Sequence, residues 1–186
     1  TLGVMTTINA DGDNYDWKNS STLAAQGDGH NGSVHYAYSE SWYSVRPPLY
    51  PDNYLVTPLV AVDETSVFTF FVCSDWYAYV GEHYGVAIST NGNANASDFT
   101  TIWEETFSGR SERAQSAWIQ KSIDLSAFAG QQVYIALRHF NCSDEFYLDI
   151  DDITLTAGGR TNGNRDMVEI GDGGNGYQYY LPSYAL

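Results

Sequence analysis

Short runs of apolar residues, separated by polar turn formers, follow one another along most of the chain. The run 67–73, VFTFFVC, is almost continuously apolar, as expected for a central strand of a sandwich. Residues 84–89 alternate large and small side chains, and Gly and Asn dominate 91–95, where the chain must turn. Further strands are predicted at 36–42, 54–57, 102–107, 118–125, 133–138 and 147–155.

Helix signals are nearly absent from the sequence. The best candidate, residues 114–117, is short, lacks a cap and runs directly into a predicted strand. A parallel α/β sheet needs a crossover helix between strands, and the spacing leaves no room for one. The sequence therefore predicts an all-β domain, a two-sheet antiparallel jelly-roll sandwich.

The character of the chain changes after Leu155. Residues 157–165 are rich in Gly and Asn, which is typical of a linker, and 177–182 is a strand-like piece without a neighbouring strand to pair with. We expect a sandwich domain at 1–157. Residues 158–186 are predicted to be a linker and a lone strand that begins a following module, and such a strand is prone to exchange with a second copy or to pack on a neighbouring repeat.

Composition adds a strongly acidic surface to this picture. The 186 residues are 43% hydrophobic and 15% aromatic, which is too apolar for a disordered coil. Lys and Arg number 8 against 23 Asp and Glu, and the net charge of −15 repels phosphate backbones and anionic membranes. We therefore expect no nucleic-acid partner. Membrane insertion is also not expected, because no run of ~18 apolar residues occurs.

Carboxylates alternate around a glycine near the N-terminus. Residues 9–17 read NADGDNYDW, and side-chain and main-chain oxygens in such a loop can converge on a hard cation such as calcium, although the spacing is not that of an EF-hand. Asp149, Asp151 and Asp152 form a second acidic group in an otherwise apolar strand, where they repel one another unless a cation or a donor offsets them. The alternative is that both groups are solvated turns or strand-edge residues.

A joint calcium site is expected if the strand 147–155 lies beside the loop 9–17. Strand alternation places Asp149 and Asp151 on one face, and Ile150 and Asp152 on the other. Three further acidic residues lie at strand ends within reach of a loop-borne ion, although such residues are more often turn caps or surface charges: Glu40, Asp52 and Glu82.

No catalytic motif is recognisable in the sequence. The serine motif G-x-S-x-G and the histidine spacing of zinc proteases are missing, and the adjacent Glu104 and Glu105 point to opposite faces of a strand. Cys73 and Cys142 are too few for a disulfide framework and fit no zinc spacing. A bridge between them, or a Cys–His nucleophile, stays open as an alternative, but their apolar flanks favour two buried, inert thiols.

Aromatic residues gather in segments that are predicted to be loops. Exposed flat rings stack on sugars and anchor protein partners, and the alternative is that they cap the ends of the sandwich. The candidate ligand-binding residues are Trp42, Tyr43, Trp76, Tyr77 and Tyr79.

A set of short motifs occurs in order over residues 3–156. They are TINADGD at 7–13, Trp17, YSES at 38–41, PDNYL at 51–55, EHY at 82–84, DFT at 98–100, EET at 104–106, Trp118, RHFNCSD at 138–144 and DDI at 151–153. As an ordered set they resemble the cleaved adhesin domains, the modules attached to gingipain-type proteases and related surface hemagglutinins. Members of this family usually open with a Phe/Glu-rich first strand, whereas this chain begins TLGVM.

The resemblance implies a jelly roll related to MAM and concanavalin-like domains, with structural calcium. It also implies a non-catalytic, adhesive role on a secreted or cell-surface bacterial protein, directed at host matrix proteins, haemoglobin or erythrocytes. Carried over to this sequence, Asp11, Asp13 and Asp151 are the first candidates for calcium ligands, and Glu40, Glu82 and Asp52 the second. The alternatives are a carbohydrate-binding module that uses the exposed aromatic loops and a structural spacer of a surface protease.

Overall fold

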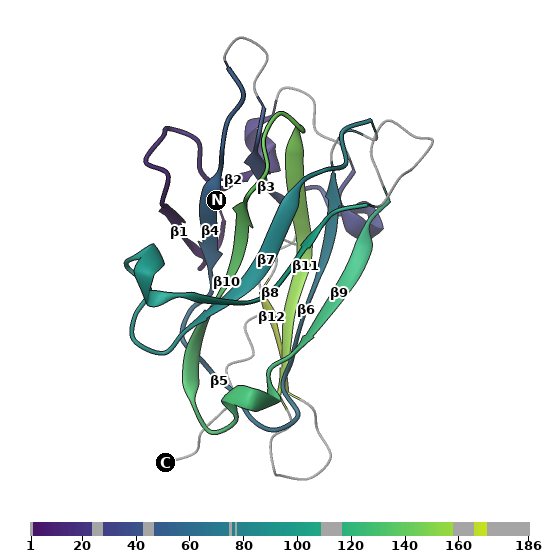
Figure 1. Ribbon diagram of the computed structural model, residues 1–186. Coiled ribbons are helices and arrows are strands. Elements are labelled where there is room, and N and C mark those ends of the chain that lie inside the picture. The colour runs from purple at the N-terminus through teal and green to yellow at the C-terminus, as the bar shows by residue number, and fades with distance from the viewer. Residues whose placement is uncertain are drawn as a thin grey trace.

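The structure, a computed structural model, is a sandwich of two antiparallel β-sheets (Figure 1). It describes residues 2–23, 28–42, 47–74, 76, 78–108 and 117–157, together with the backbone of 166–170. The predicted all-β, two-sheet architecture is confirmed. The weak helix candidate at 114–117 lies, except for Ala117, outside the described residues.

The first sheet is built around β10. In spatial order its strands are β1 (Thr6–Asn9), β4 (Asp52–Val56), β10 (Gln132–Phe140), β7 (His83–Ser89) and β8 (Thr100–Thr106), and β5 (Val60–Ala61) pairs with the start of β10. Sequence patterning does not predict β1 or β5, because both are too short to show an alternation.

The second sheet is built around β11 and β6. In spatial order its strands are β2 (Lys18–Asn19), β3 (Ala37–Glu40), β11 (Tyr147–Ala157), β6 (Val67–Ser74) and β9 (Ile119–Asp124). The described helices are single 3₁₀ turns, none long and apolar enough to cross a membrane: η1 (Ser20–Thr22), η2 (His30–Gly32), η3 (Ala96–Asp98) and η4 (Ser126–Phe128).

A further strand, β12 (Asp166–Ile170), pairs antiparallel with Ile153–Ala157 of β11. The sequence analysis does not predict it. The expected linker at 158–165 and the strand-like piece at 177–182 lie outside the described residues, so the domain boundary at 157 stays a prediction.

Strand β6 supplies the centre of the core, as its apolar run predicts. Phe68, Phe70 and Val72 are completely buried, and the rings of Phe68 and Phe70 lie 5.8 Å apart. The alternate side chains point to the other face of the sheet, where Phe71 stacks on His30 at a centroid distance of 3.5 Å. Each large apolar side chain buried here contributes about 1.5–3 kcal/mol to the stability of the fold.

Strand β11 departs from regular alternation at its middle. Its register with β6 shifts between Asp151 and Thr154, and Asp152 has a positive φ of 46°. Ile150 packs in the core before this bulge and Ile153 does so after it. The expectation that Asp152 shares a face with Ile150 is therefore wrong, because the extra residue in the bulge resets the alternation.

The register of β10 distinguishes the two ends of the sandwich. At its start Val133 pairs with Val60 of β5, whereas at its end Phe140 pairs with Asp52, the first residue of β4. The connections that follow β3, β6 and β10 all lie at the Phe140 end (Figure 1). These three connections carry the candidate site.

Candidate functional site

An aromatic cleft lies at the end of the sandwich where β10 finishes, with a volume of about 300 Å³. Its lining residues come from the segments after β3, after β6 and before β11: Trp42, Trp76, Tyr79, Asp144, Glu145 and Phe146. The structure thus brings together three of the five aromatic residues predicted for ligand contact. The other two, Tyr43 and Tyr77, lie outside the described residues.

Phe146 is the centre of the aromatic surface. Its ring centroid lies 5.3 Å from that of Trp42, 5.6 Å from that of Trp76 in an edge-to-face pair, and 4.2 Å from that of Tyr147 in a stack. The edge-to-face geometry of the Trp76 pair is a favourable one for aromatic rings. Trp76 is 46% exposed and Tyr79 is 50% exposed, so the rings are packed against one another and still present a large surface to solvent.

Hydrogen bonds shape the segment after β6, which carries Trp76 and Tyr79. The Ser74 hydroxyl donates to the Tyr79 carbonyl oxygen at 2.6 Å, and the Tyr79 N–H donates to the Trp76 carbonyl oxygen at 3.0 Å. The turn is thus closed at its base by the last residue of β6.

The segment before β11 is fixed by Ser41, which directly follows β3. The Ser41 carbonyl accepts the Asp144 N–H at 3.1 Å, and the Ser41 hydroxyl accepts the Glu145 N–H at 3.2 Å. The Glu145 carboxylate accepts the Gly81 N–H at 2.9 Å, an approach so close that a Cβ on Gly81 would clash with the same carboxylate. Both charged residues of the cleft therefore have anchored backbones.

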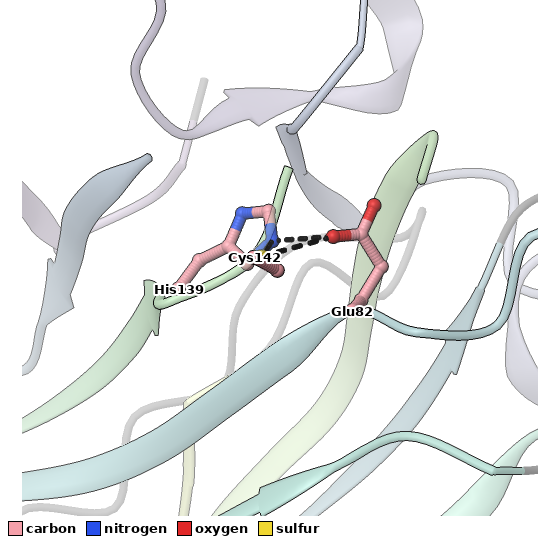
Figure 2. Close-up of side chains that lie close together, drawn as sticks. All are labelled: Glu82, His139 and Cys142. Atoms are coloured by element: carbon pink, nitrogen blue, oxygen red, sulfur yellow. Dashed lines mark hydrogen bonds and ion pairs between the residues drawn. The ribbon is translucent and has the colours of Figure 1, made fainter. Parts of the chain in front are cut away.

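Glu82 lies beneath the cleft and is completely buried. One carboxylate oxygen accepts the Ser41 hydroxyl at 2.8 Å and the Phe146 N–H at 2.9 Å, and the other lies 2.8 Å from Nε2 of His139 (Figure 2). Burial alone raises the pKa of Glu82, but the His139 charge and the hydrogen bonds outweigh it, and the pKa falls below its ordinary value. An ionised Glu82 thus holds the cleft floor in place.

Cys142 completes this buried group, with Sγ 3.1 Å from His139 Nε2 and 3.3 Å from Glu82 Oε2 (Figure 2). Burial raises the pKa of the thiol, and the negative charge of Glu82 raises it further. The geometry of a Cys–His nucleophile is therefore present without the thiolate that such chemistry needs. Neither cysteine forms a disulfide within the described residues, and Cys73 is buried, as the thiol interpretation predicts, whereas Cys142 is partly buried.

Among the described residues, Glu82, His139 and Cys142 are the only three acidic, His or Cys side chains whose ligand atoms lie within 4.8 Å of one another. One thiol, one imidazole and one carboxylate suit zinc better than calcium, which prefers an all-oxygen shell. The predicted calcium ligand Glu82 thus sits in a donor set that does not fit calcium, and both of its carboxylate oxygens already have donors within the chain.

In the loop after β1, two predicted calcium ligands form turns. Asp11 accepts the Asp13 N–H at 2.9 Å and the Asp52 N–H at 2.7 Å, and Asp13 accepts the Tyr15 N–H at 2.6 Å. The Asp52 carboxylate is held by Arg138 through two hydrogen bonds, of 2.7 and 3.0 Å. The loop thus keeps its carboxylates close together, whereas Asp52 is neutralised by a guanidinium.

Glu40, at the end of β3, is 4% exposed. Lys18 Nζ lies 3.3 Å from one of its oxygens, and Oε2 is buried without a hydrogen-bond partner. Burial raises the pKa of Glu40, Lys18 opposes this, and the nearby charge of Asp13 adds to it. A buried, unpartnered carboxylate oxygen near a second carboxylate fits the oxygen-rich environment that calcium uses.

Asp151 is bound by two backbone N–H groups, one of them from η2. Its carboxylate accepts the His30 N–H at 2.9 Å and the Asp152 N–H at 2.8 Å, and burial raises its pKa to about 6. The ring atom Nδ1 of His30 also lies 2.6 Å from an oxygen of the Asp152 carboxylate. Within the described residues no three-ligand group joins Asp151 to Asp11 and Asp13, and the joint site stays a prediction.

A family model described as "Cleaved Adhesin Domain" matches residues 3–155 of the chain. The chain belongs to the cleaved adhesin family. It is 37% identical over 175 residues to Hemagglutinin A and 39% identical over 164 residues to Gingipain R1, both of Porphyromonas gingivalis. These matches cover 84% and 83% of this chain but only 8% and 9% of those proteins, so it corresponds to a small part of each.

Solved structures of this family have the same fold. The K1 cleaved adhesin domain of Lys-gingipain from P. gingivalis W83 is similar with a TM-score of 0.74 at 39% identity, covering 84% of this chain and 92% of that domain. The K3 domain of the same protein is similar with a TM-score of 0.71 at 36% identity, over the same shares. The resemblance inferred from the motifs is confirmed, and with it the expectation of a non-catalytic adhesin module.

Sequence reasoning does not place His139, Cys142 or Asp144 at the cleft, although all three lie in the motif at 138–144 that carries the family resemblance. A signal was available, because that motif directly follows a predicted strand and concentrates polar residues at its end. What the sequence lacks is the partner of each residue, since Ser41 and Glu82 come from distant segments.

Proposed function

We propose that this cleaved adhesin domain is an adhesive module of a secreted or cell-surface bacterial protein, and that it binds a host protein through the aromatic cleft. The observation that carries the proposal is the convergence of Trp42, Trp76 and Tyr79 in one cleft, with two of the rings about half exposed. Exposed aromatic side chains in a concave surface are the usual anchors of protein recognition. The names of the relatives, a hemagglutinin and gingipains, support an adhesive role.

Host matrix proteins, haemoglobin and erythrocyte surfaces are the proposed partners. A spacer without a ligand would need these aromatic side chains to be buried, and their exposure favours a binding role instead. A carbohydrate ligand would contact the same rings, so the experiment must distinguish carbohydrate binding from protein binding.

Binding of the purified domain to immobilised fibrinogen, fibronectin and haemoglobin, and to a glycan array, tests this function. The Trp76→Ala variant is expected to lose at least about thirtyfold in affinity, since an anchor residue of this kind contributes about 2 kcal/mol or more. Leu59→Ala is the matched control, because Leu59 is 47% exposed and lies next to β5 at the other end of the sandwich. Equal binding by both variants contradicts the proposal, and a signal on glycans alone replaces the protein partner with a carbohydrate.

We also propose that calcium stabilises the domain, with Asp11, Asp13 and Glu40 as its most suitable ligands. The support is the partnerless Glu40 Oε2, the proximity of Asp13 and the clustering of carboxylates in the loop after β1. A bound divalent cation would offset the mutual repulsion of these carboxylates. Asp52 and Glu82 are less suitable, because Arg138 and His139 already contact their carboxylates.

A further inference from the structure

Among the described residues that line the cleft, the two charged ones, Asp144 and Glu145, are both acidic. Glu145 uses one carboxylate oxygen to accept the Gly81 N–H, whereas the carboxylate of Asp144 makes no hydrogen bond or ion pair with the described residues. No basic side chain is among the lining residues that the structure describes, and the whole chain carries a net charge of −15. The described part of the cleft therefore combines aromatic walls with two carboxylates.

The backbone around Asp144 is held in a defined place. Asp144 has a positive φ of 62°, its N–H is bound by the Ser41 carbonyl, and the next two residues are anchored by Ser41 and Glu82. Little backbone freedom is left for a ligand to remove on binding, which favours affinity.

From these observations, and resting on the proposed function, we propose that the cleft binds an arginine side chain presented by an exposed segment of the partner protein. The guanidinium is planar, weakly hydrated and permanently charged. It can stack on an aromatic face while it donates two hydrogen bonds to a carboxylate. In this arrangement Asp144 accepts the guanidinium hydrogen bonds, and Trp76 or Phe146 provides the stacking face.

Other ligand classes fit these features less well. A lysine ammonium is compact and strongly hydrated, so it uses the aromatic faces less effectively than arginine does. A neutral sugar gains stacking and hydrogen bonds but no charge attraction, and an anionic ligand is repelled by both carboxylates. Charge is therefore the property that distinguishes the proposed ligand from a carbohydrate.

The first experiment measures binding of three short glycine-flanked peptides to the wild-type domain by tryptophan fluorescence and calorimetry. Their central residues are arginine, lysine and citrulline, the last an uncharged analogue of arginine with nearly the same shape. The arginine peptide is expected to bind at least about fivefold more tightly than the citrulline peptide, with lysine between them, and to weaken as salt is raised. Equal affinity of the arginine and citrulline peptides, or no saturable binding of either, overturns the proposal.

The second experiment uses Asp144→Asn, which keeps the size of the side chain and suits a positive φ. This variant is expected to lose the preference for arginine over citrulline. Glu64→Gln is the matched control, because it removes the same charge from an exposed turn that follows β5. If Asp144→Asn keeps the preference for arginine over citrulline, the proposal is overturned. The measured quantity is the ratio of the two affinities, which does not change when both peptides bind more weakly by the same factor.

The two experiments also separate this inference from the proposed function. If Trp76→Ala abolishes adhesion to host proteins while the arginine peptide does not compete with them, the arginine inference is overturned and the adhesive function stands. If the arginine peptide binds and competes, both are supported. If adhesion is insensitive to Trp76→Ala and no peptide binds, both fall.

Discussion

At the scale of single residues, the buried carboxylate of Glu82 connects three segments that are distant in the sequence. It accepts hydrogen bonds from Ser41 and Phe146 through one oxygen, and the other oxygen lies 2.8 Å from His139 and 3.3 Å from Cys142. Removing the charge leaves these donors in a dry environment without a full acceptor, and unpaired buried polar groups are costly.

Glu82→Gln is therefore expected to lower the free energy of unfolding by about 3 kcal/mol. Urea denaturation measures the loss, and tryptophan fluorescence reports whether the cleft is altered at the same time. The exposed Glu64→Gln control is expected to stay within about 0.5 kcal/mol of the wild type. A loss below about 1 kcal/mol for Glu82→Gln would show that the network does not support the fold as described.

At the scale of elements, the bulge in β11 determines how η2 packs against the second sheet. It places the carboxylates of Asp151 and Asp152 where His30 contacts both, and the His30 ring stacks on Phe71 of β6. A regular strand would turn one of the two carboxylates toward the core. The bulge thus allows an acidic pair to occupy the middle of an otherwise apolar strand.

This arrangement predicts a pH dependence for Asp151, whose pKa is raised by burial from 3.8 to about 6. The folded state binds the proton more tightly than the unfolded chain, so this group contributes stability that is complete below pH 3.8 and lost as the pH rises through about 6. In EDTA, the stability difference between wild type and Asp151→Asn is expected to change by up to about 1.4 kcal/mol per pH unit in this window, with the wild type losing stability. A difference that is flat with pH contradicts the prediction.

At the scale of the whole molecule, the distribution of charge affects the stability of the fold more than any single ion pair does. The net charge of −15 disfavours the compact state through self-repulsion, and the loop after β1 concentrates carboxylates beside the end of β3. A divalent cation at this place would relieve that repulsion and connect segments from both sheets. The proposed calcium therefore has a thermodynamic consequence for the entire domain.

Thermal unfolding in EDTA, and again after calcium is added back, tests this consequence. A calcium concentration ~100-fold above the dissociation constant stabilises the native state by about 2.7 kcal/mol, which raises Tm by roughly 5–10 °C for a domain of this size. The shift is expected to disappear in Asp13→Asn and to persist in Glu64→Gln. Magnesium at equal concentration controls for ionic strength. If calcium does not raise Tm, the calcium proposal is contradicted and the acidic loop is a solvated turn.

The family, the all-β class and most of the strands were predictable from the sequence alone. Strands 67–73, 84–89 and 133–138 are long enough to show their apolar pattern, and local patterning is sufficient where one face or both faces are buried. Trp42, Trp76 and Tyr79 were predictable as cleft residues because they lie in turn-rich segments, whereas Phe146 was not predicted.

The assembly of the site was decided only by the tertiary structure. Trp42, Trp76 and Phe146 come from three separate connections, and Glu82 meets His139 because β7 and β10 are neighbours in the first sheet. The bulge at Asp152 likewise has no local signature, because it depends on how β11 is registered against β6. Sequence periodicity determines which face of a strand is buried, whereas hydrogen-bond partners, charge compensation and the convergence of loops depend on contacts between residues far apart in the chain.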